Sequence, residues 1–179
     1  MGRTLTKIGL ELSQTMALPI TVRRATQEDA ASVSECLAAA FAIYRSQYTP
    51  GAFEDTVLSP EAVKRRMLRM TLYVAITPEG DVVGTIASTL HGGHGHLRGM
   101  AVAPAWQGQS VAQALLRAAE ADLAAAGCGR LTLNTTVPLQ RAIRFYERNG
   151  FAATGTVTDF FGMPLHEFAK TLDSARPIS

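Results

Sequence analysis

The sequence predicts a mixed α/β domain in which helices cover both faces of a sheet. One sign is a hairpin pattern, in which two β-rich runs, residues 72–76 and 82–87, are joined by the turn residues 78–81. A second sign is the amphipathic helix pattern of residues 110–126, which follows a strand-like run. The whole predicted order is a strand, helices, three strands, a helix, a strand, a helix and two strands.

The elements of the first third are indicated by alternation and by helix start signals. Residues 20–23 alternate apolar and polar side chains, which predicts a strand. An acidic start and an Ala-rich run predict a helix over residues 26–41. Residues 43–58 mix aromatic residues with Pro and Gly and predict a loop with short helical pieces. Ser59 and Pro60 predict the start of another helix, because Pro is tolerated at the first helical position.

The later elements are marked by Gly and Pro punctuation. The Gly- and His-rich residues 91–96 predict a flexible connection to a strand at residues 97–102, which Pro104 ends. The helix over residues 110–126 ends at Gly127. The remaining predicted elements are a strand at 131–135, a helix at 136–149 and two strands around Phe160 and Phe168.

Length and composition predict one ordinary globular domain. The chain has 179 residues, of which 47% are hydrophobic and 18% charged. The domain is expected over residues 19–172, with a mobile N-terminal tail at 1–18, in which Met16 is an alternative start, and a C-terminal tail at 173–179. No apolar run approaches the roughly 20 residues that a membrane span needs, so no membrane partner is expected.

The net charge and the cysteine content indicate which classes of binding partner and which cellular compartment to expect. The net charge of +2 is too small to predict a nucleic-acid partner, although it allows a local basic site for an anionic cofactor. Cys36 and Cys128 occur without a secretory signal and are expected to be reduced, buried thiols. The predicted location is cytoplasmic.

A turn between a strand and a helix, at residues 107–112, predicts a phosphate site. A helix N-terminus exposes unpaired N–H groups and a partial positive charge, and small residues let the backbone approach an anion closely. Gly108, Ser110 and Ala112 meet that size limit. The alternative is an ordinary strand–helix connection with small residues. The predicted binding residues are Gln107, Gly108, Gln109, Ser110, Val111 and Ala112.

Two motifs in this chain resemble those of the GNAT superfamily of acetyl-coenzyme A N-acetyltransferases. The string V-A-P-A-W-Q-G-Q-S-V-A at residues 102–112 is similar to the family pattern V-x-P-x-x-[QR]-x-x-G-x-[GA]. The string A-I-R-F-Y-E-R-N-G-F at residues 142–151 matches A-I-x-F-Y-x-x-x-G-F, and residues 20–29 look like the family's first strand and helix. The resemblance covers residues 20–172 and implies a mostly antiparallel sheet of six to seven strands.

The chain departs from the family pattern at two positions. Ser110 replaces the usual glycine, so its backbone must tolerate a Cβ or accept strain, while its hydroxyl offers a phosphate contact or a helix cap. Leu139 stands where the family commonly has an asparagine that touches the pantetheine arm of the cofactor. The second departure puts one cofactor contact in doubt.

The resemblance implies transfer of an acetyl group from acetyl-CoA to a primary amine, by direct attack in a ternary complex. Tyr146 matches the tyrosine that protonates the leaving thiolate, and a phenol of pKa about 10 suits that role. Alternatively, Tyr146 belongs to a core stripe with Leu139 and Ala142. Backbone N–H groups near Met100, Ala101 and Val102 would polarise the thioester carbonyl.

His96 is the second candidate catalytic residue. Several family members have a glutamate as general base at this place, and a histidine with a pKa near 6.5 suits the task. Alternatively, His96 only starts a strand. Gly99 predicts a bulge, which would change which face His96 shares with Met100.

For the other polar residues, the sequence allows either a contact with the cofactor or an ordinary structural role. Asn134 faces the cofactor or is an ordinary polar residue at a strand end. The basic residues Arg141, Arg144 and Arg148 contact the cofactor's nucleotide phosphate or form a solvated face. The histidines His91, His94 and His96 offer only weak metal binding without a fourth ligand, so no metal site is predicted.

The acceptor is expected to bind at residues 42–70, where Tyr44, Tyr48 and Phe53 wall a pocket or lie in the core, the latter being favoured for Phe53. The expected partner is a small-molecule or peptide amine that the sequence does not identify. The family commonly forms homodimers, although no residue here indicates one. The alternative functions are a non-catalytic coenzyme-A-binding regulatory module and a nucleotide-binding protein, against which the absence of G-x-x-x-x-G-K-[ST] counts.

Overall fold

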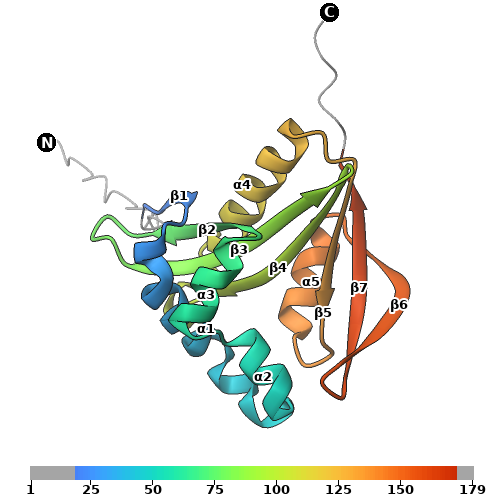
Figure 1. The fold of residues 1–179 in the computed structure, drawn as a ribbon, viewed down its shortest axis with the longest axis horizontal. Helices are drawn as coiled ribbons and strands as arrows, with labels where there is room; N and C mark the ends of the chain where they lie inside the picture. Colours follow the sequence, from blue (N-terminus) through green and yellow to red (C-terminus); the bar gives the residue numbers. More distant parts are fainter. Residues whose placement is uncertain (1–18, 173–179) are drawn as a thin grey trace, which may run out of the picture.

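The computed structural model describes residues 19–172, which form a seven-stranded sheet of order β1-β2-β3-β4-β5-β7-β6 (Figure 1). Of the strand pairs within these residues, only β4 and β5 are parallel, so the predicted mixed, mostly antiparallel sheet is confirmed. The two predicted tails lie outside the described residues. The strands are β1 (Thr21–Arg24), β2 (Thr71–Ile76), β3 (Val82–His91), β4 (His94–Val102), β5 (Arg130–Thr135), β6 (Ala152–Phe160) and β7 (Met163–Thr171).

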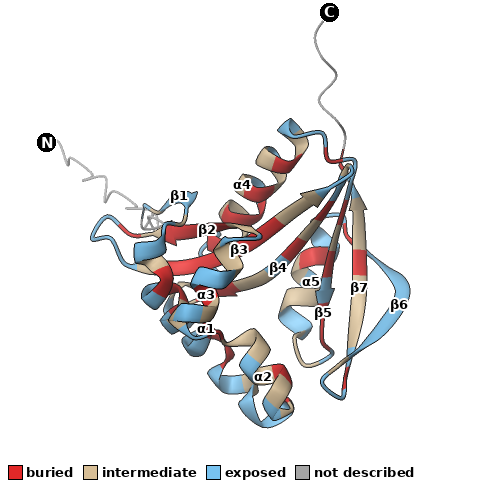
Figure 2. Ribbon diagram, viewed as in Figure 1, coloured by how far each residue is buried: buried red, intermediate tan, exposed pale blue. Residues whose placement is uncertain are grey.

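Helices cover both faces of this sheet, as predicted. One core cluster joins α4 and α5 to the sheet, and a second joins α1, α2 and α3 to the opposite face (Figure 2). None of the helices in residues 19–172 has the length and apolar character required to cross a membrane. The helices are α1 (Ala30–Phe41), α2 (Pro50–Thr56), α3 (Pro60–Met67), α4 (Val111–Ala125) and α5 (Gln140–Arg148), with short 3₁₀ turns at 27–29, 42–47 and 104–106.

Local sequence signals explain where these helices begin and which side they bury. The hydroxyl of Ser59 accepts a hydrogen bond from the backbone N–H of Ala62, and Pro60 occupies the first turn of α3, as predicted. The predicted stripe of α4 is buried. Burial of a large apolar side chain stabilises the fold by about 2 kcal/mol, so this stripe fixes α4 against the sheet. Its members are Val111, Leu115, Ala119 and Leu123.

The prediction of a flexible connection at residues 91–96 is wrong. Strands β3 and β4 continue to the end of a tight hairpin, in which His91 pairs with His94. The turn residues Gly92 and Gly93 have φ values of 54° and 80°. Two successive positive φ angles are what a two-residue hairpin turn requires, and glycine supplies them without strain. The predicted start of α5 at residue 136 is also too early, because residues 136–139 form a turn that contains Pro138.

The predicted bulge in β4 is confirmed. Thr85 pairs with Ala101 and Ala87 pairs with Arg98, so that Gly99 and Met100 lie together opposite a single residue of β3. Gly99 has a φ of 63°, which glycine adopts readily. The pairing of β4 with β5 ends at Leu97. The two central strands therefore part beyond this point, and the gap between them is where the candidate site lies.

Candidate active site

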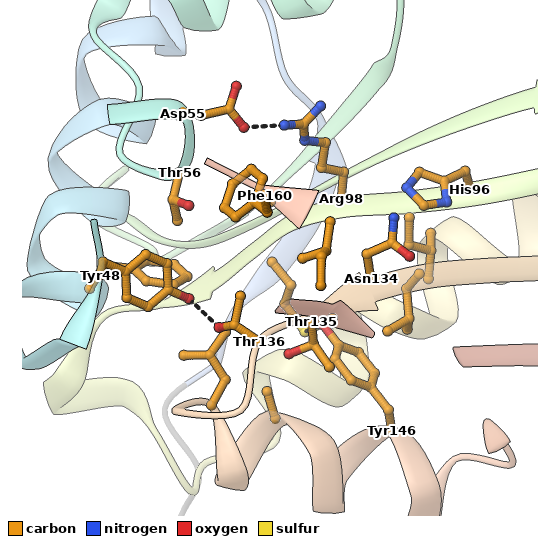
Figure 3. A pocket seen from close by; sticks show the side chains of 18 of the residues that line it. Tyr48, Asp55, Thr56, His96, Arg98, Asn134, Thr135, Thr136, Tyr146 and Phe160 are labelled. Carbon is orange, nitrogen blue, oxygen red and sulfur yellow. Dashed lines mark hydrogen bonds and ion pairs between the residues drawn. The ribbon is translucent and has the colours of Figure 1, made fainter. Parts of the chain in front are cut away.

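A cavity of about 210 Å³ occupies the place where β4 and β5 separate (Figure 3). Its walls come from β4 and β5, from α1, α2, α3 and α5, and from single residues of β6 and β7, so residues far apart in the sequence meet there. The cavity brings together both predicted catalytic residues, His96 and Tyr146. Polar groups therefore surround a space that is large enough for reacting groups to meet.

Tyr146 projects from α5 into this cavity and is 8% exposed. Among the described residues its hydroxyl has one hydrogen-bond partner, the sulfur of Met100 at 3.6 Å, which is a weak acceptor. Burial raises the pKa of this phenol above its usual value, so Tyr146 stays protonated at neutral pH. Tyr146 also packs against Phe145 and Phe151. The two sequence-based readings are thus compatible, because the ring belongs to the core and the hydroxyl to the cavity.

His96 is oriented by a chain of hydrogen bonds. Its Nδ1 lies 2.9 Å from the hydroxyl of Thr132 on β5, and that hydroxyl donates to the carbonyl oxygen of Gly95 at 3.2 Å. Because the single proton of the hydroxyl is used towards Gly95, its oxygen accepts from His96, which assigns the proton of the neutral ring to Nδ1. The lone pair is then on Nε2, and this atom is available as a base.

The environment of His96 favours its neutral form. Burial lowers the pKa of the imidazole, and the nearby Arg98 lowers it further, against a smaller opposing effect of Glu167. The ring is therefore unprotonated at neutral pH. This is the form that a general base must have before it accepts a proton.

The bulge places His96 and Met100 on opposite faces of the sheet. Met100 packs in the core cluster that contains Tyr146, and Leu97 belongs to the same cluster. His96 precedes Leu97 in the strand, so its side chain points to the other face, where it lies beside Asn134 (Figure 3). The candidate base and the candidate acid thus approach the gap from opposite sides.

The predicted phosphate turn has the unpaired donors that an anion site needs. Within residues 19–172, the backbone N–H groups of residues 108–113 donate to no protein acceptor. The turn is held in place by its own side chains, since Gln107 Nε2 donates to Val102 O (3.1 Å) and Gln109 Nε2 donates to Ala105 O (2.8 Å). A cradle of free N–H groups at the start of α4 can accept a pyrophosphate.

Ser110 carries backbone strain at this turn. Its φ is 64° and its ψ is 9°, a left-handed conformation that costs about 1–2 kcal/mol for a residue with a Cβ. Its side chain does not cap α4. Of the readings that the sequence left open, the structure therefore shows strain without a helix cap, which leaves the hydroxyl available to a ligand.

The edge of β4 beyond the bulge faces the gap. Ala103 N–H donates to Val83 O of the neighbouring strand β3. Backbone groups of successive residues in a strand point in opposite directions, so the polar backbone of Val102 faces away from β3. The bond from Gln107 to Val102 O agrees with this direction. An open strand edge at Val102 can thus donate to a carbonyl oxygen in the gap.

Two residues at the end of β5 and the start of α5 complete the wall near Tyr146. The hydroxyl of Thr135 is buried, lines the cavity and has no hydrogen-bond partner among residues 19–172. A buried polar atom without a partner costs about 1–3 kcal/mol, which a bound ligand would offset. Leu139 lines the cavity as an apolar surface and packs with the second core cluster.

The remaining candidates take different places. Asn134 is exposed and lies with His96 on the face of β5 opposite Tyr146. Arg141 Nη1 donates to Gln107 Oε1 at 2.9 Å, so the start of α5 lies beside the phosphate turn. Arg144 and Arg148 are exposed. Among the described residues, no group of three His, Cys, Asp or Glu side chains is arranged to hold a metal ion.

The predicted acceptor segment contributes one aromatic wall. Tyr48 lines the cavity, and its hydroxyl lies 2.7 Å from that of Thr136. Burial is the main cause of its raised pKa. Tyr44 packs on Phe41 and does not line the cavity. Phe53 packs edge-on against Tyr48 at 6.4 Å and against the second core cluster, which agrees with the core reading.

Sequence reasoning missed several cavity residues because no motif contains them. Thr132 and Thr135 are ordinary strand residues in the sequence, and only their pairing partners give them a role. Asp55, Arg66 and Arg98 form a charged group in the cavity wall that comes from three separate elements. The glycine at position 99 was the one sequence signal for this group, because a glycine within a strand can indicate that another part of the chain, here the Arg66 side chain, approaches the backbone closely.

A split between two parallel central strands, a cradle of free N–H groups and a buried phenol at the gap define a coenzyme-A-dependent acyltransferase. Residues 37–151 match the family described as Acetyltransferase (GNAT) family. The chain belongs to this family, it is an acyltransferase, and acetyl-CoA is its cosubstrate. The recognised motifs at residues 102–112 and 142–151 both fall inside the matched range.

Two sequence relatives have acetyltransferase names. The chain is 30% identical over 158 residues to an aminoglycoside N(6')-acetyltransferase type 1 of Stenotrophomonas maltophilia, covering 83% of this chain and 96% of that protein. It is 35% identical over 93 residues to an IAA acetyltransferase of Azospirillum brasilense, covering 51% of this chain and 61% of that protein. The second match thus spans less than two thirds of the relative.

Solved structures show the same fold. The PaiA N-acetyltransferase of Thermoplasma acidophilum, solved in complex with coenzyme A, has a TM-score of 0.72 at 18% identity, covering 86% of this chain and 99% of that one. The ribosomal-protein-S18-alanine N-acetyltransferase of Escherichia coli has a TM-score of 0.71 at 18% identity, covering 90% and 99%. At such identities the likeness establishes the fold.

Proposed function

We propose that this protein transfers the acetyl group of acetyl-CoA to a primary amine of a small molecule or peptide by direct attack in a ternary complex. The observation that carries the proposal is the position of His96 and Tyr146, which reach one cavity from opposite faces of the sheet. His96 would act as the base for the amine and Tyr146 as the acid for the thiolate. The gap between β4 and β5 separates the two side chains. No cysteine or serine lines this cavity in the described part of the chain, which favours direct transfer over a covalent enzyme intermediate.

The chain has groups that fit each part of the cosubstrate. The free N–H groups of residues 108–113 would hold the pyrophosphate, the gap would admit the pantetheine arm, and the backbone N–H of Val102 would donate to the thioester oxygen. Met100 lies in the bulge beside it, whereas Ala101 pairs with Thr85 and directs its polar backbone towards β3, so Ala101 is not expected to donate. Thr135 offers a further polar contact, and Asn134 is a candidate on the other face of β5. Bound acetyl-CoA supplies an activated acyl carbon and a thiolate as leaving group.

The proton flow follows from the two pKa shifts. His96 Nε2 takes a proton from the attacking amine, since the lowered pKa of the ring keeps it neutral at physiological pH. Tyr146 donates a hydrogen bond and then a proton to the sulfur, since its raised pKa keeps the hydroxyl protonated. Thiols have a reference pKa near 8.5, and the desolvation that raises the pKa of Tyr146 would also make a thiolate in the same cavity more basic.

Release of free coenzyme A thiol across a panel of amines tests this function. We expect amine-dependent release with the unmodified protein and strongly reduced release with Tyr146→Phe and His96→Ala. Calorimetric titration with coenzyme A would accompany the assay, because a regulatory module would bind the coenzyme without turning over any amine. Activity that neither substitution changes would contradict the assigned roles.

The free, buried state of Cys36 and Cys128 fits a reducing compartment such as the cytoplasm. Burial raises the pKa of the Cys36 thiol to about 11, so this thiol is unreactive at neutral pH. Neither cysteine lines the cavity. These thiols therefore support a structural role and leave the chemistry to His96 and Tyr146.

A further inference from the structure

The lining of the cavity carries more positive than negative charge. The ionisable side chains that line the cavity are Asp55, Arg66, His96, Arg98 and the two phenols Tyr48 and Tyr146. The phenols and His96 are neutral at physiological pH, given the directions of their pKa shifts. Two guanidinium groups and one carboxylate remain, which leaves one positive charge in excess.

Arg98 and Asp55 neutralise one another. The guanidinium of Arg98 forms an ion pair with the carboxylate of Asp55 across the space between β4 and α2 (Figure 3). The side chains are 44% and 32% exposed, so the pair lies at the rim of the cavity. A pair of this exposure contributes little to stability. Because of this ion pair, the carboxylate of Asp55, which is the one carboxylate among the described lining residues, is not free to pair with another cation.

Of the two guanidinium groups that line the cavity in the described part of the chain, the one of Arg66 has no carboxylate partner. Within residues 19–172 its guanidinium forms no ion pair, and its one hydrogen bond is a long contact of 3.5 Å from Nη2 to the carbonyl oxygen of Asp55. Arg66 is half-buried, and burial, followed by the charge of Arg98, lowers its pKa to about 10, against a smaller opposing effect of the Asp55 carboxylate. A guanidinium offers five N–H donors in a planar fork that matches a carboxylate or phosphate. Most of that donor capacity is unused here.

The position of Arg66 is close to where the acceptor amine must lie. A Cβ built on Gly99 would come within 2.8 Å of Arg66 Nη1, so the guanidinium sits directly against the bulge of β4. The bulge lies in the same strand as His96, and both line the cavity. An anionic group held by Arg66 would therefore be a short distance from an amine whose proton goes to His96.

We propose that the acceptor amine carries an anionic group, a carboxylate or a phosphate, which binds to Arg66. This inference rests on the proposed function, because it names the class of amine that the same cavity takes. It makes Arg66 a specificity-determining residue, with Arg98 held in place by Asp55 as its neighbour. The excess positive charge would also lower the pKa of an ammonium group in the cavity and so favour the neutral, nucleophilic amine.

The inference separates this chain from its relative named as an aminoglycoside acetyltransferase. An acceptor with several ammonium groups would place like charges next to Arg66, in a cavity where the one lining carboxylate of the described residues, Asp55, is already paired with Arg98. We therefore expect a poor response to polyamine-type acceptors.

Matched amine pairs test the proposal. Alanine, leucine and phenylalanine would each be compared with their carboxamides, and phosphoethanolamine with ethanolamine, so that the two arms distinguish a carboxylate from a phosphate. One readout is kcat/KM from thiol release. The other is calorimetric binding of each amine to the protein saturated with coenzyme A, which needs no turnover. The variants are Arg66→Gln and Arg66→Lys, with Arg65→Gln as control, since Arg65 is an exposed neighbour in α3 that does not line the cavity.

In the carboxylate series or in the phosphate pair, we expect the unmodified protein and Arg65→Gln to bind the anionic amine more tightly than its neutral counterpart. The expected ratio of affinities is roughly 10- to 100-fold, as for a charge-assisted hydrogen bond. Arg66→Gln should abolish most of this preference, and Arg66→Lys should retain part of it. Equal binding of both members by the unmodified protein, or a preference that Arg66→Gln leaves intact, would overturn the proposal. If Arg66→Gln does not fold, Arg66→Lys and the unmodified protein decide. A binding preference without any thiol release would support this inference and contradict the proposed function.

Discussion

Two parts of the proposed site are built in different ways: the part proposed to bind the coenzyme, called the coenzyme wall, and the part proposed to bind the amine, called the acceptor wall. The coenzyme wall runs in one continuous stretch from β4 through the turn to α4, together with α5, and of these elements β4 and α5 line the cavity. Its proposed binding groups are mostly backbone N–H groups and one buried phenol. The acceptor wall consists of side chains from α2, α3, β4 and the end of β6, which meet only in the folded chain. Under the proposed function, backbone geometry would therefore fix the binding of the coenzyme, while scattered side chains would determine the choice of acceptor.

Tyr146→Phe gives the largest expected effect and tests the coenzyme wall. Loss of the acid should lower kcat by about 100-fold or more, and by a similar factor for every acceptor, because the thiolate is the same in each reaction. The thermal midpoint should change little, since the hydroxyl forms a single hydrogen bond within residues 19–172, to the weakly accepting sulfur of Met100. Steady-state kinetics with several amines, accompanied by thermal denaturation, would check this. A loss confined to one acceptor would place Tyr146 on the acceptor wall instead.

The pH dependence of the reaction tests the base on the opposite face. The pKa of His96 is lowered by burial, so its basic form is present above an inflection that lies below pH 6.5. We expect kcat to rise with pH through that inflection and then level off. In His96→Gln this limb should be absent and the remaining rate should be lower, by about 100-fold. An unchanged limb in His96→Gln would show that another group is the base.

Thr132→Val sharpens the comparison, because it removes the bond that orients His96 without touching a substrate. The side chain is close in size, but the ring loses its acceptor for Nδ1 and can adopt the other tautomer. We expect kcat to fall by about fivefold, equivalent to about 1 kcal/mol, with KM unchanged. Thr132→Ser should restore the rate. If Thr132 had a purely structural role, Thr132→Val would lower the thermal midpoint, and Thr132→Ser would not restore the rate.

Ser110→Gly is expected to have the smallest effect. Removal of the Cβ relieves a left-handed conformation, and the larger entropy of glycine in the unfolded chain offsets part of the gain. The free energy of unfolding should rise by up to about 1 kcal/mol, as measured by urea denaturation. Coenzyme A affinity should stay within a few-fold if the backbone N–H groups carry the binding. A large loss of affinity would show that the Ser110 hydroxyl is a phosphate ligand.

The difference between the coenzyme wall and the acceptor wall also explains which parts of the fold and the site could be predicted from the sequence. The turn at residues 107–112 between a strand and a helix, the bulge at Gly99 and the position of Tyr146 were predictable, because each depends on residues that are close in the chain. Phosphate binding at the turn stays a prediction. Thr132 could not be assigned a role, since its partner His96 is 36 positions away and meets it only through the parallel pairing of β4 and β5. Arg66 was equally hidden, because its contact with the bulge depends on how α3 packs over β4.

The most direct test of the central claim is an initial-velocity study in which acetyl-CoA and an accepted amine are varied together. If His96 and Tyr146 act on two substrates that meet in one cavity, both must bind before any product leaves. We therefore expect double-reciprocal lines that intersect, and coenzyme A release that depends on the amine. Parallel lines, with acetyl groups retained on the protein in the absence of amine, would contradict direct transfer in this cavity.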